Sequence, residues 1–213
     1  EGSARIADKI DMHRFDYKPS IEGCRVAILG VNDGRNSGDN AGCSAGPDAI
    51  RNYLYKLTPH SRWATVADIG DIRNSFSEDE TEVALIAVVS ELVQMGIIPI
   101  VLGGGQDLTY AMYSALESIG RPMNVVTVDQ RLDFGGDPQV ATSRNFMNRI
   151  VLHEPNYLFD YVNVGHQGYL SDPDTLDLLE RLQFEAIRLG QVHTDPKLLE
   201  PTFRNADLIS IDM

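Results

Sequence analysis

The sequence predicts an α/β fold in which a mostly parallel sheet is covered by helices on both faces, a three-layer arrangement. Three observations support this prediction: short apolar runs alternate with capped helical segments, the alternation continues along the chain, and no linker-like tract interrupts it. The 213 residues, 43% of them hydrophobic, are enough for a core of this size. We therefore expect one α/β domain over residues 25–213, preceded by an N-terminal extension over residues 1–24.

Five short apolar runs predict the strands of the sheet. They are largely apolar throughout rather than alternating, as expected for strands buried on both faces. The runs are residues 25–31, 97–102, 124–128, 157–164 and 207–212. In parallel sheets ligands bind beyond the carboxyl ends of the strands, so the residues that leave each strand are the candidate functional residues.

The helices between these strands are marked by signals at their ends. Prolines in the first turn, capping side chains and terminal glycines all occur at the expected places. Ser77 and Glu80 have the spacing of a capping box, for example. The expected helices begin at Pro47, run from Ser77 to Gly96, and cover about 106–119, 173–189 and 196–204.

Charge and composition exclude several classes of protein. Eighteen basic residues against 31 acidic ones give a net charge of -13, the wrong sign for binding the phosphates of nucleic acid or an anionic membrane. No apolar run reaches the ~20 residues of a membrane span, and no signal peptide is recognisable. Cys24 and Cys43 lack CxxC spacing and fit unpaired thiols in a reducing compartment. We expect a cytoplasmic protein with neither a nucleic-acid nor a membrane partner.

Polar clusters follow three of the expected strands. They are Gly103-Gly104-Gly105-Gln106-Asp107, Asp129-Gln130-Arg131-Leu132-Asp133 and Ser210-Ile211-Asp212. Parallel strands would bring all three clusters to one edge of the sheet. In an extended segment, Asp129, Arg131 and Asp133 would point to the same side, with the guanidinium between two carboxylates. A tight turn is the alternative interpretation of the glycines, and a helix cap that of any single aspartate.

The order and spacing of these motifs resemble the ureohydrolase family, which includes arginase, agmatinase and formimidoylglutamase. The likeness runs from Arg25 to Met213, and residues 46–51 are similar to the G-P-x-A-I-R helix start of the family. Residues 102–106, 128–133 and 210–212 stand where the family has L-G-G-D-H, D-A-H-x-D and S-x-D-x-D. The run after Leu102 is most similar to a divergent formimidoylglutamase-like branch. The resemblance implies an arginase-like fold that is incomplete at its C-terminal end, because relatives continue with further strands and helices.

The resemblance also implies a dimanganese hydrolase of linear amidine C–N bonds, in which four aspartates and two histidines hold the metals. Three of the aspartates are matched by Asp129, Asp133 and Asp212. The fourth would fall one position after Met213. The two histidine positions are occupied by Gln106 and Arg131.

Arg131 is the departure from the family with the largest chemical effect. A guanidinium has no lone pair to donate, and it repels a divalent ion about 4 Å away by roughly 8 kcal/mol at an effective dielectric constant near 20. We therefore expect Arg131 to replace the second metal and to pair with Asp129 and Asp212. The oxygen ligands that are left, Gln106, Asp129, Asp133 and Asp212, would hold at most one weakly bound divalent ion.

The predicted function is that of a formimidoylglutamase-like protein whose degraded metal site leaves weak or no classical activity. One alternative is a C–N hydrolase with one metal or none; another is a non-catalytic module that grips a small carboxylate ligand or a protein partner through Arg131 or Arg144. Arg144 stands where the family has a proton-shuttle histidine, so the candidate catalytic residues are Asp129, Arg131, Asp133 and Arg144.

The candidate substrate-binding residues are His166, Gln167 and Asn32, each near the end of a predicted strand. An ordinary hydrogen-bonded loop histidine is the alternative interpretation of His166. The expected ligand is a small amidine or amino-acid-like molecule. The resemblance also implies homo-oligomers.

Overall fold

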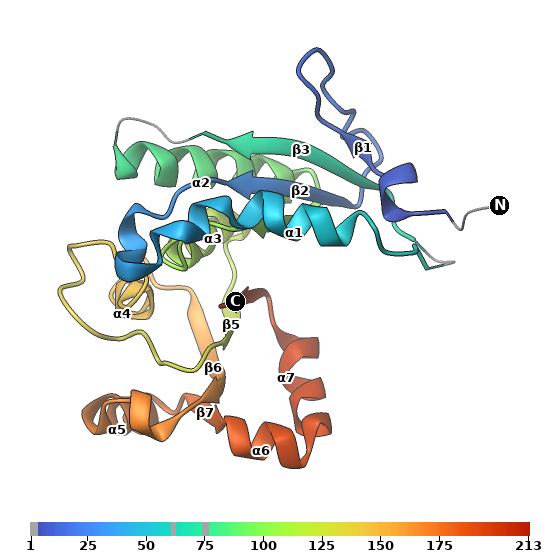
Figure 1. Ribbon diagram of the computed structural model, residues 1–213. Coiled ribbons are helices and arrows are strands. Elements are labelled where there is room, and N and C mark those ends of the chain that lie inside the picture. Colours follow the sequence, from blue (N-terminus) through green and yellow to red (C-terminus); the bar gives the residue numbers. More distant parts are fainter. Residues whose placement is uncertain (1–3, 61–62, 74–76) are drawn as a thin grey trace. The chain divides into compact units, whose positions relative to one another are not determined.

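The computed structural model describes residues 4–60, 63–73 and 77–213, and it forms two compact units (Figure 1). The first unit comprises Glu1–Gly105 and Ser114–Ile119, and the second comprises Gln106–Tyr113 and Gly120–Met213. Each unit is built on a four-stranded sheet whose strands pair in parallel. The predicted α/β class with parallel sheets is therefore confirmed. Residues 1–3 of the predicted N-terminal extension lie outside the described residues.

The sheet of the first unit has the strand order β1-β3-β2-β4. Its elements are η1 (Ile6–Asp8), β1 (Asp11–Met12), β2 (Val26–Val31), η2 (Arg35–Ala45), α1 (Gly46–Leu54), β3 (Val66–Ile72), α2 (Glu78–Gln94), β4 (Ile98–Leu102) and η3 (Glu117–Ile119). Strands β2 and β4 match the runs predicted at 25–31 and 97–102. Strand β1, within the expected extension, pairs with β3.

The helix signals of the first unit act as the sequence predicts. Pro47 is buried in the first turn of α1. Ser77 Oγ accepts a hydrogen bond from the Glu80 N–H at 3.3 Å and so caps α2. Gly96, with φ of 75°, follows the end of that helix in the left-handed conformation that glycine tolerates best.

The glycine triplet after β4 forms the tight turn that was the alternative interpretation. Gly103 has φ of 71°, and a Cβ at this position would lie 2.2 Å from Pro47 Cδ. Only glycine allows α1 to approach the turn this closely. The Gly105 N–H also donates to the Asp33 carbonyl oxygen at 2.8 Å, which fixes the loop after β2 against the turn.

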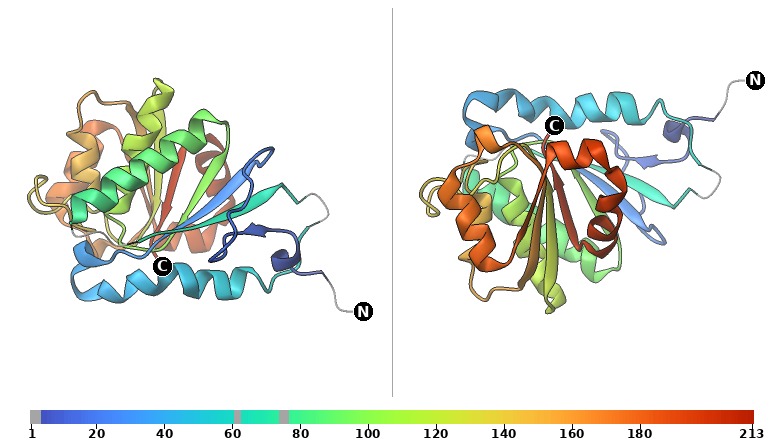
Figure 2. Two further views of the ribbon diagram at one scale, coloured as in Figure 1. Left: turned by 90° about the horizontal axis from the view of Figure 1, so that it is seen from above. Right: turned by 90° about the horizontal axis from the view of Figure 1, so that it is seen from below.

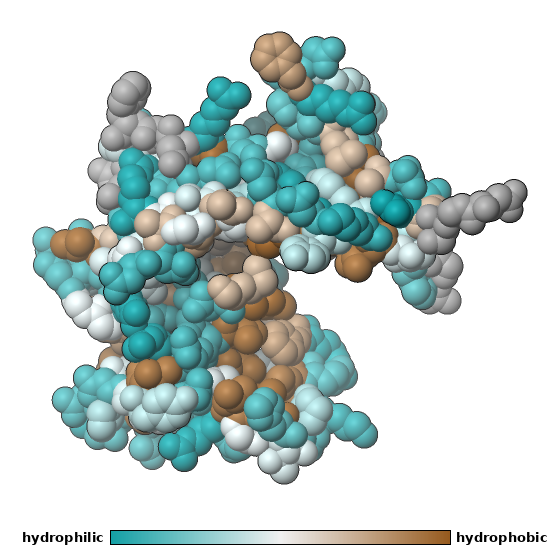
Figure 3. Space-filling view, in the orientation of Figure 1, coloured by the Kyte–Doolittle hydropathy of each residue, from teal (hydrophilic) through white to brown (hydrophobic). Residues whose placement is uncertain are grey.

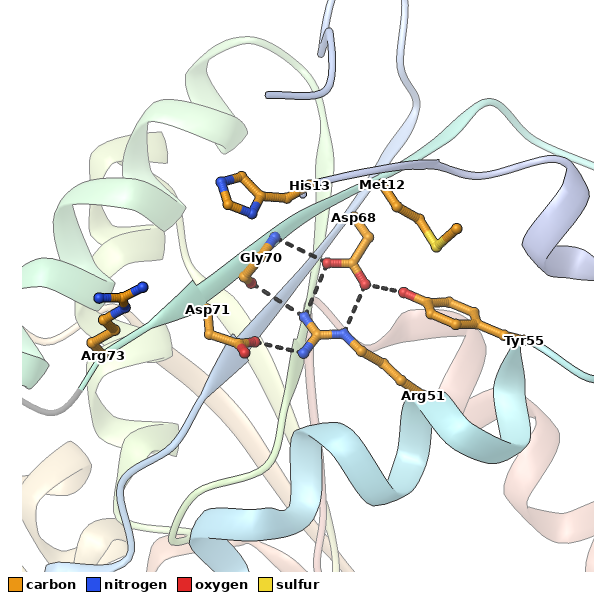
Figure 4. A pocket seen from close by; sticks show the side chains of 8 residues that line it. All are labelled: Met12, His13, Arg51, Tyr55, Asp68, Gly70, Asp71 and Arg73. Carbon is orange, nitrogen blue, oxygen red and sulfur yellow. Dashed lines mark hydrogen bonds and ion pairs between the residues drawn. The ribbon is translucent and has the colours of Figure 1, made fainter. Parts of the chain in front are cut away.

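A partly buried network of ion pairs fastens α1 to β3 (Figure 4). Arg51 donates from Nε and Nη2 to the two carboxylate oxygens of Asp68, at 2.7 and 2.9 Å, and from Nη1 to Asp71 at 2.5 Å. The Tyr55 hydroxyl donates to Asp68 as well. A Cβ on Gly30 would lie 1.9 Å from Asp71 Oδ1, so the network packs directly against β2.

The sheet of the second unit has the strand order β7-β6-β5-β8, and its strands run side by side in Figure 2. Helix α3 (Leu108–Leu116) begins in this unit. The further elements are β5 (Met123–Val128), α4 (Phe146–Val151), β6 (Leu158–His166), η4 (Gly168–Leu170), α5 (Pro173–Leu182), β7 (Glu185–Arg188), α6 (Leu189–Thr194), η5 (Pro196–Leu198), α7 (Leu199–Asn205) and β8 (Leu208–Ile211).

The predicted helix over 173–189 is wrong in its second half. Helix α5 ends at Leu182, because Gln183 adopts a left-handed conformation with φ of 60°, and strand β7 follows. Ile187 is the one residue of this short strand that is fully buried, so the sequence carries no strand pattern there. Strand β3 escaped prediction for a related reason, since Asp68 and Asp71 interrupt its apolar residues.

Hydrophobic side chains cover one face of the second sheet. Val126, Val162, Val164 and Ile187 form a buried cluster, and Phe203 of α7 and Val192 of α6 pack against it. Figure 3 shows hydrophobic side chains gathered on the surface of this unit beside α7. Within the described ranges, we find no helix with the length and apolar character needed to cross a membrane.

Candidate active site at the carboxyl ends of β5 and β8

Two aspartates leave neighbouring strands of the second unit at the same level. The Asp129 N–H donates to the Val164 carbonyl of β6 at 3.0 Å, and the Asp212 N–H donates to the Val128 carbonyl of β5 at 3.0 Å. These bonds continue the parallel ladders just past the strand ends. The sheet thus brings Asp129 and Asp212 to one edge, as the sequence predicts.

The chain bends after β5 so that a third aspartate turns back toward the first. The Arg131 N–H donates to Asp129 Oδ1 at 2.8 Å and closes a turn. Asp133 then adopts φ of 51°, a left-handed conformation that is uncommon outside glycine. Asp129 and Asp133 are 6% and 8% exposed, so two carboxyl groups are buried side by side.

This grouping strongly perturbs the acidity of Asp133. Burial, followed by the charge and the hydrogen bond of Asp129, raises the pKa of the Asp133 carboxyl to about 9. Burial and the same Asp129 charge raise the pKa of Asp212. A buried carboxyl group next to a second carboxylate is harder to ionise, so Asp133 keeps its proton at neutral pH.

The cation that acts on these carboxyl groups is Arg144. Its charge lowers the pKa of both Asp133 and Asp212, against the larger effects that raise them. Asn145 fixes the loop that carries Arg144, because its side chain donates to the carbonyls of Asp137 and Val140, both at 2.7 Å.

The expected pairing of Arg131 with Asp129 and Asp212 is wrong. Among the described residues, no ion pair joins the Arg131 guanidinium to either carboxylate, although the Arg131 backbone contacts Asp129. The expectation assumed an extended segment with alternating side chains, whereas residues 130 and 131 form a bend. Arg131 therefore contacts the acidic cluster through its backbone, and its charge does not neutralise the cluster.

Gln106 precedes α3, and Thr109 of that helix hydrogen-bonds through Oγ1 to Ser210 Oγ of β8 at 2.7 Å. This bond ties the start of α3 to the strand that ends at Asp212. The Gln106 Nε2 atom is buried and has no hydrogen-bond partner among the described residues. An amide held in this way is available to a ligand.

A buried polar network that sequence reasoning missed supports the bend at Arg131. Asn163 Nδ2 donates to the Arg131 carbonyl at 2.7 Å and to Thr127 Oγ1 at 3.2 Å. Thr127 Oγ1 also bonds the Tyr161 hydroxyl at 2.8 Å. The sequence signal was present, since Asn163 interrupts the apolar run of β6.

The predicted substrate-binding residues have diverse surroundings. His166 ends β6 and is 4% exposed, and burial, with the charge of Arg188, lowers its pKa. Its Nδ1 atom lacks a partner among the described residues. Gln167 hydrogen-bonds to Gln130, the neighbour of Asp129, by backbone and side chain. Asn32 belongs to the first unit and donates to the Ser44 carbonyl at 3.1 Å.

Comparison with known proteins assigns the family. The family model described as "Arginase family" matches residues 24–206. The chain belongs to the arginase family. Among its arginase-family relatives, formimidoylglutamase of Streptococcus gordonii is 28% identical over 180 residues, covering 77% of this chain and 53% of its own. Formimidoylglutamase of Cupriavidus pinatubonensis is 33% identical over 152 residues, covering 67% of this chain and 46% of its own.

Solved structures confirm the arginase-like fold. A Trypanosoma cruzi formiminoglutamase with manganese superposes with a TM-score of 0.81 at 21% identity, covering 96% of this chain and 72% of its own. This chain spans about half to two thirds of the length of the formimidoylglutamases that it matches in sequence. It is likewise shorter than the chains of the solved structures.

Proposed function

We propose that the chain is a formimidoylglutamase-like member of the linear-amidine C–N hydrolases whose two-manganese site is degraded, so that classical activity is weak or lost. The observation that carries this proposal is the pair of buried carboxyl groups of Asp129 and Asp133, in which burial and the Asp129 charge raise the pKa of Asp133 to about 9, in a segment where Arg131 takes the place of a histidine. A metal bound there would have to displace the proton of Asp133, and it would find no imidazole at position 131.

The available donor atoms do not fit two manganese ions. A histidine imidazole offers a lone pair to a metal, whereas a guanidinium offers none and an amide oxygen is a weak neutral ligand. Gln106 and Arg131 stand at the two positions where the family resemblance implies histidines. Within residues 4–60, 63–73 and 77–213, no three His, Cys, Asp or Glu side chains are grouped so that they could hold a metal ion. A single weakly held divalent ion is the most that this set supports.

The same cluster suits a cationic ligand. An amidinium is planar and carries two N–H donors that match a carboxylate, so Asp129 and the exposed Asp212 would orient it. Gln167 and Gln130 add amide groups near Asp129. The neutral form of Asp133 is available to donate a proton to the ligand. These residues support binding of a small amidine, while activation of water would need a further group.

Turnover of N-formimidoyl-L-glutamate with Mn²⁺ tests this proposal. We expect turnover by the protein near background and an increase in Gln106→His/Arg131→His, which restores two imidazoles. The control variant Gln94→His/Arg204→His makes the same changes at exposed positions and should gain neither turnover nor manganese. Manganese-dependent turnover by the unmodified protein at the rate of a formimidoylglutamase would contradict the proposal, and so would a double variant that gains neither manganese nor activity.

A second candidate function is binding of a small carboxylate ligand by Arg131. The guanidinium has no ion-pair partner among the described residues, which leaves its planar donors available to a carboxylate. Glutamate should then raise the melting temperature, by an amount that Arg131→Ala abolishes and Arg204→Ala preserves. Equal shifts in the two variants would exclude this function.

A further inference from the structure

A polar side chain lies in the middle of the apolar strand β6. Asn163 is 0% exposed, and its neighbours Val162 and Val164 are buried as well. Strand β6 pairs with β5 on one side and with β7 on the other, so it is a central strand of its sheet. Apolar β-branched residues suit such a position best. Packing alone therefore does not explain why an amide stands at this position.

The Asn163 amide is only partly satisfied by hydrogen bonds. Its Nδ2 atom donates to the Arg131 carbonyl at 2.7 Å and to Oγ1 of Thr127, its register partner in β5, at 3.2 Å. Its Oδ1 atom is buried and has no hydrogen-bond partner among the described residues. A buried acceptor without a donor lowers the stability of a fold. This arrangement points to a role for the Nδ2 bonds beyond the stability of the sheet.

The Arg131 peptide is held from both sides. Its N–H donates to Asp129 Oδ1 at 2.8 Å, and its carbonyl accepts the bond from Asn163. Two residues later, Asp133 has φ of 51°, and its buried carboxyl group hydrogen-bonds to that of Asp129. A residue other than glycine keeps such a conformation where the surrounding structure imposes it. The bond from Asn163 is a contact of this kind, because it comes from a different strand.

We propose that Asn163 is a positioning residue for the carboxylate cluster. By holding the Arg131 carbonyl, it fixes the bend that turns Asp133 back toward Asp129, and it thereby sets the spacing of the carboxyl groups. Both of its hydrogen bonds go to other groups, so it acts on the cluster through the backbone. Small displacements of binding groups cost much affinity. The part of this proposal that concerns ligand binding rests on the proposed function.

Amide hydrogen exchange of Asn163→Leu, followed by NMR, tests the positioning role without a ligand. Leucine has a similar shape but no donor, so the bend should open locally and expose the Arg131 N–H. We expect this amide to exchange at least about tenfold faster relative to the Asp212 N–H, which bonds to the Val128 carbonyl instead. Taking the ratio of the two rates removes any change in global stability. An unchanged ratio would overturn the proposal.

The matched control is Asn156→Leu, the same substitution just before the other end of β6. The Asn156 side chain donates to the carbonyls of Ile150 and Val151 and accepts from the Leu158 N–H, so its loss should also lower stability. It should leave the exchange ratio unchanged. If Asn163→Leu does not fold, Asn163→Ser serves instead, because its side chain is one atom shorter and cannot reach the Arg131 carbonyl. Equal changes of the ratio at positions 156 and 163 would reduce Asn163 to an ordinary structural residue.

Calorimetric titration with acetamidinium then tests the consequence for ligand binding. We expect the dissociation constant to rise at least about tenfold in Asn163→Leu and to stay the same in Asn156→Leu. Equal affinities of the unmodified protein and Asn163→Leu would overturn the link between the bend and binding. A lack of binding by the unmodified protein would count against amidine binding in the proposed function, and the exchange ratio would still decide the role of Asn163.

Discussion

The two units each hold an arginine among aspartates, and the two arrangements are opposites. In the first unit, Arg51 donates to both oxygens of Asp68 and to Asp71, and the Arg51 and Asp68 side chains are 13% and 5% exposed. In the second unit, Arg131 has no ion pair among the described residues, while Asp133 nearby is buried against another carboxyl group and carries a proton. The same residue types give one satisfied cluster and one unsatisfied cluster.

The difference shows which cluster serves the fold and which is available for chemistry. Buried charges that are fully hydrogen-bonded hold elements in place, as Arg51 holds α1 against β3. Groups left unpaired lower stability, and they are found where a ligand completes the site. We therefore assign the Arg51 network to structure and the Asp129 cluster to binding.

The largest effect is expected from Arg51→Met. Removing the guanidinium leaves the Asp68 carboxylate buried without its charge partner, which costs about 3 to 5 kcal/mol of the free energy of unfolding. Urea denaturation measures the loss. Arg204→Met removes a surface partner of Glu200, at 69% and 58% side-chain exposure, and should cost less than about 1 kcal/mol. Similar losses of unfolding free energy in the two variants would show that the network has no special structural role.

A pH-dependent effect is expected from Asp133→Asn. Folding raises the pKa of Asp133 to about 9, so its contribution to stability is fully present below about pH 4 and is lost as the pH rises through 9. Asparagine mimics the protonated form and removes this loss. The stability of the variant relative to the unmodified protein should therefore increase from pH 5 to pH 9, by at most about 1.4 kcal/mol per pH unit.

Denaturation in EDTA at several pH values measures this difference. The matched control is Asp177→Asn, which neutralises an exposed carboxylate on α5. Its stability relative to the unmodified protein should stay nearly constant over the same range. A difference for Asp133→Asn that does not change with pH would mean that folding does not raise the pKa of Asp133.

The smallest effect is expected from Arg131→Met. Because the guanidinium has no ion-pair partner among the described residues, its loss should change the free energy of unfolding by no more than about 0.5 kcal/mol. The informative quantity is the difference between the unfolding free energies lost in Arg51→Met and in Arg131→Met, both measured by urea denaturation. A loss of 3 kcal/mol or more would show that Arg131 is paired as Arg51 is, against the geometry described above.

Much of the fold and half of the site could be predicted from the sequence. Continuous apolar runs identified β2, β4, β5, β6 and β8, and the strand-end rule placed Asp129 and Asp212 at one edge. The bend at 130–131 could not be predicted, because it depends on a hydrogen bond from Asn163 of another strand. The left-handed conformation of Asp133 could not be predicted either, because tertiary contacts decide which local backbone conformation a residue adopts.

Binding of Mn²⁺ by the unmodified protein, followed by electron paramagnetic resonance of the free ion at pH 7.5, tests the central claim most directly. We predict that fewer than one ion binds per chain at micromolar Mn²⁺, and that Gln106→His/Arg131→His raises both the number and the affinity. Two ions bound tightly per unmodified chain would contradict the account, because the loss of the two histidines and the proton on Asp133 would then not prevent assembly of the metal centre.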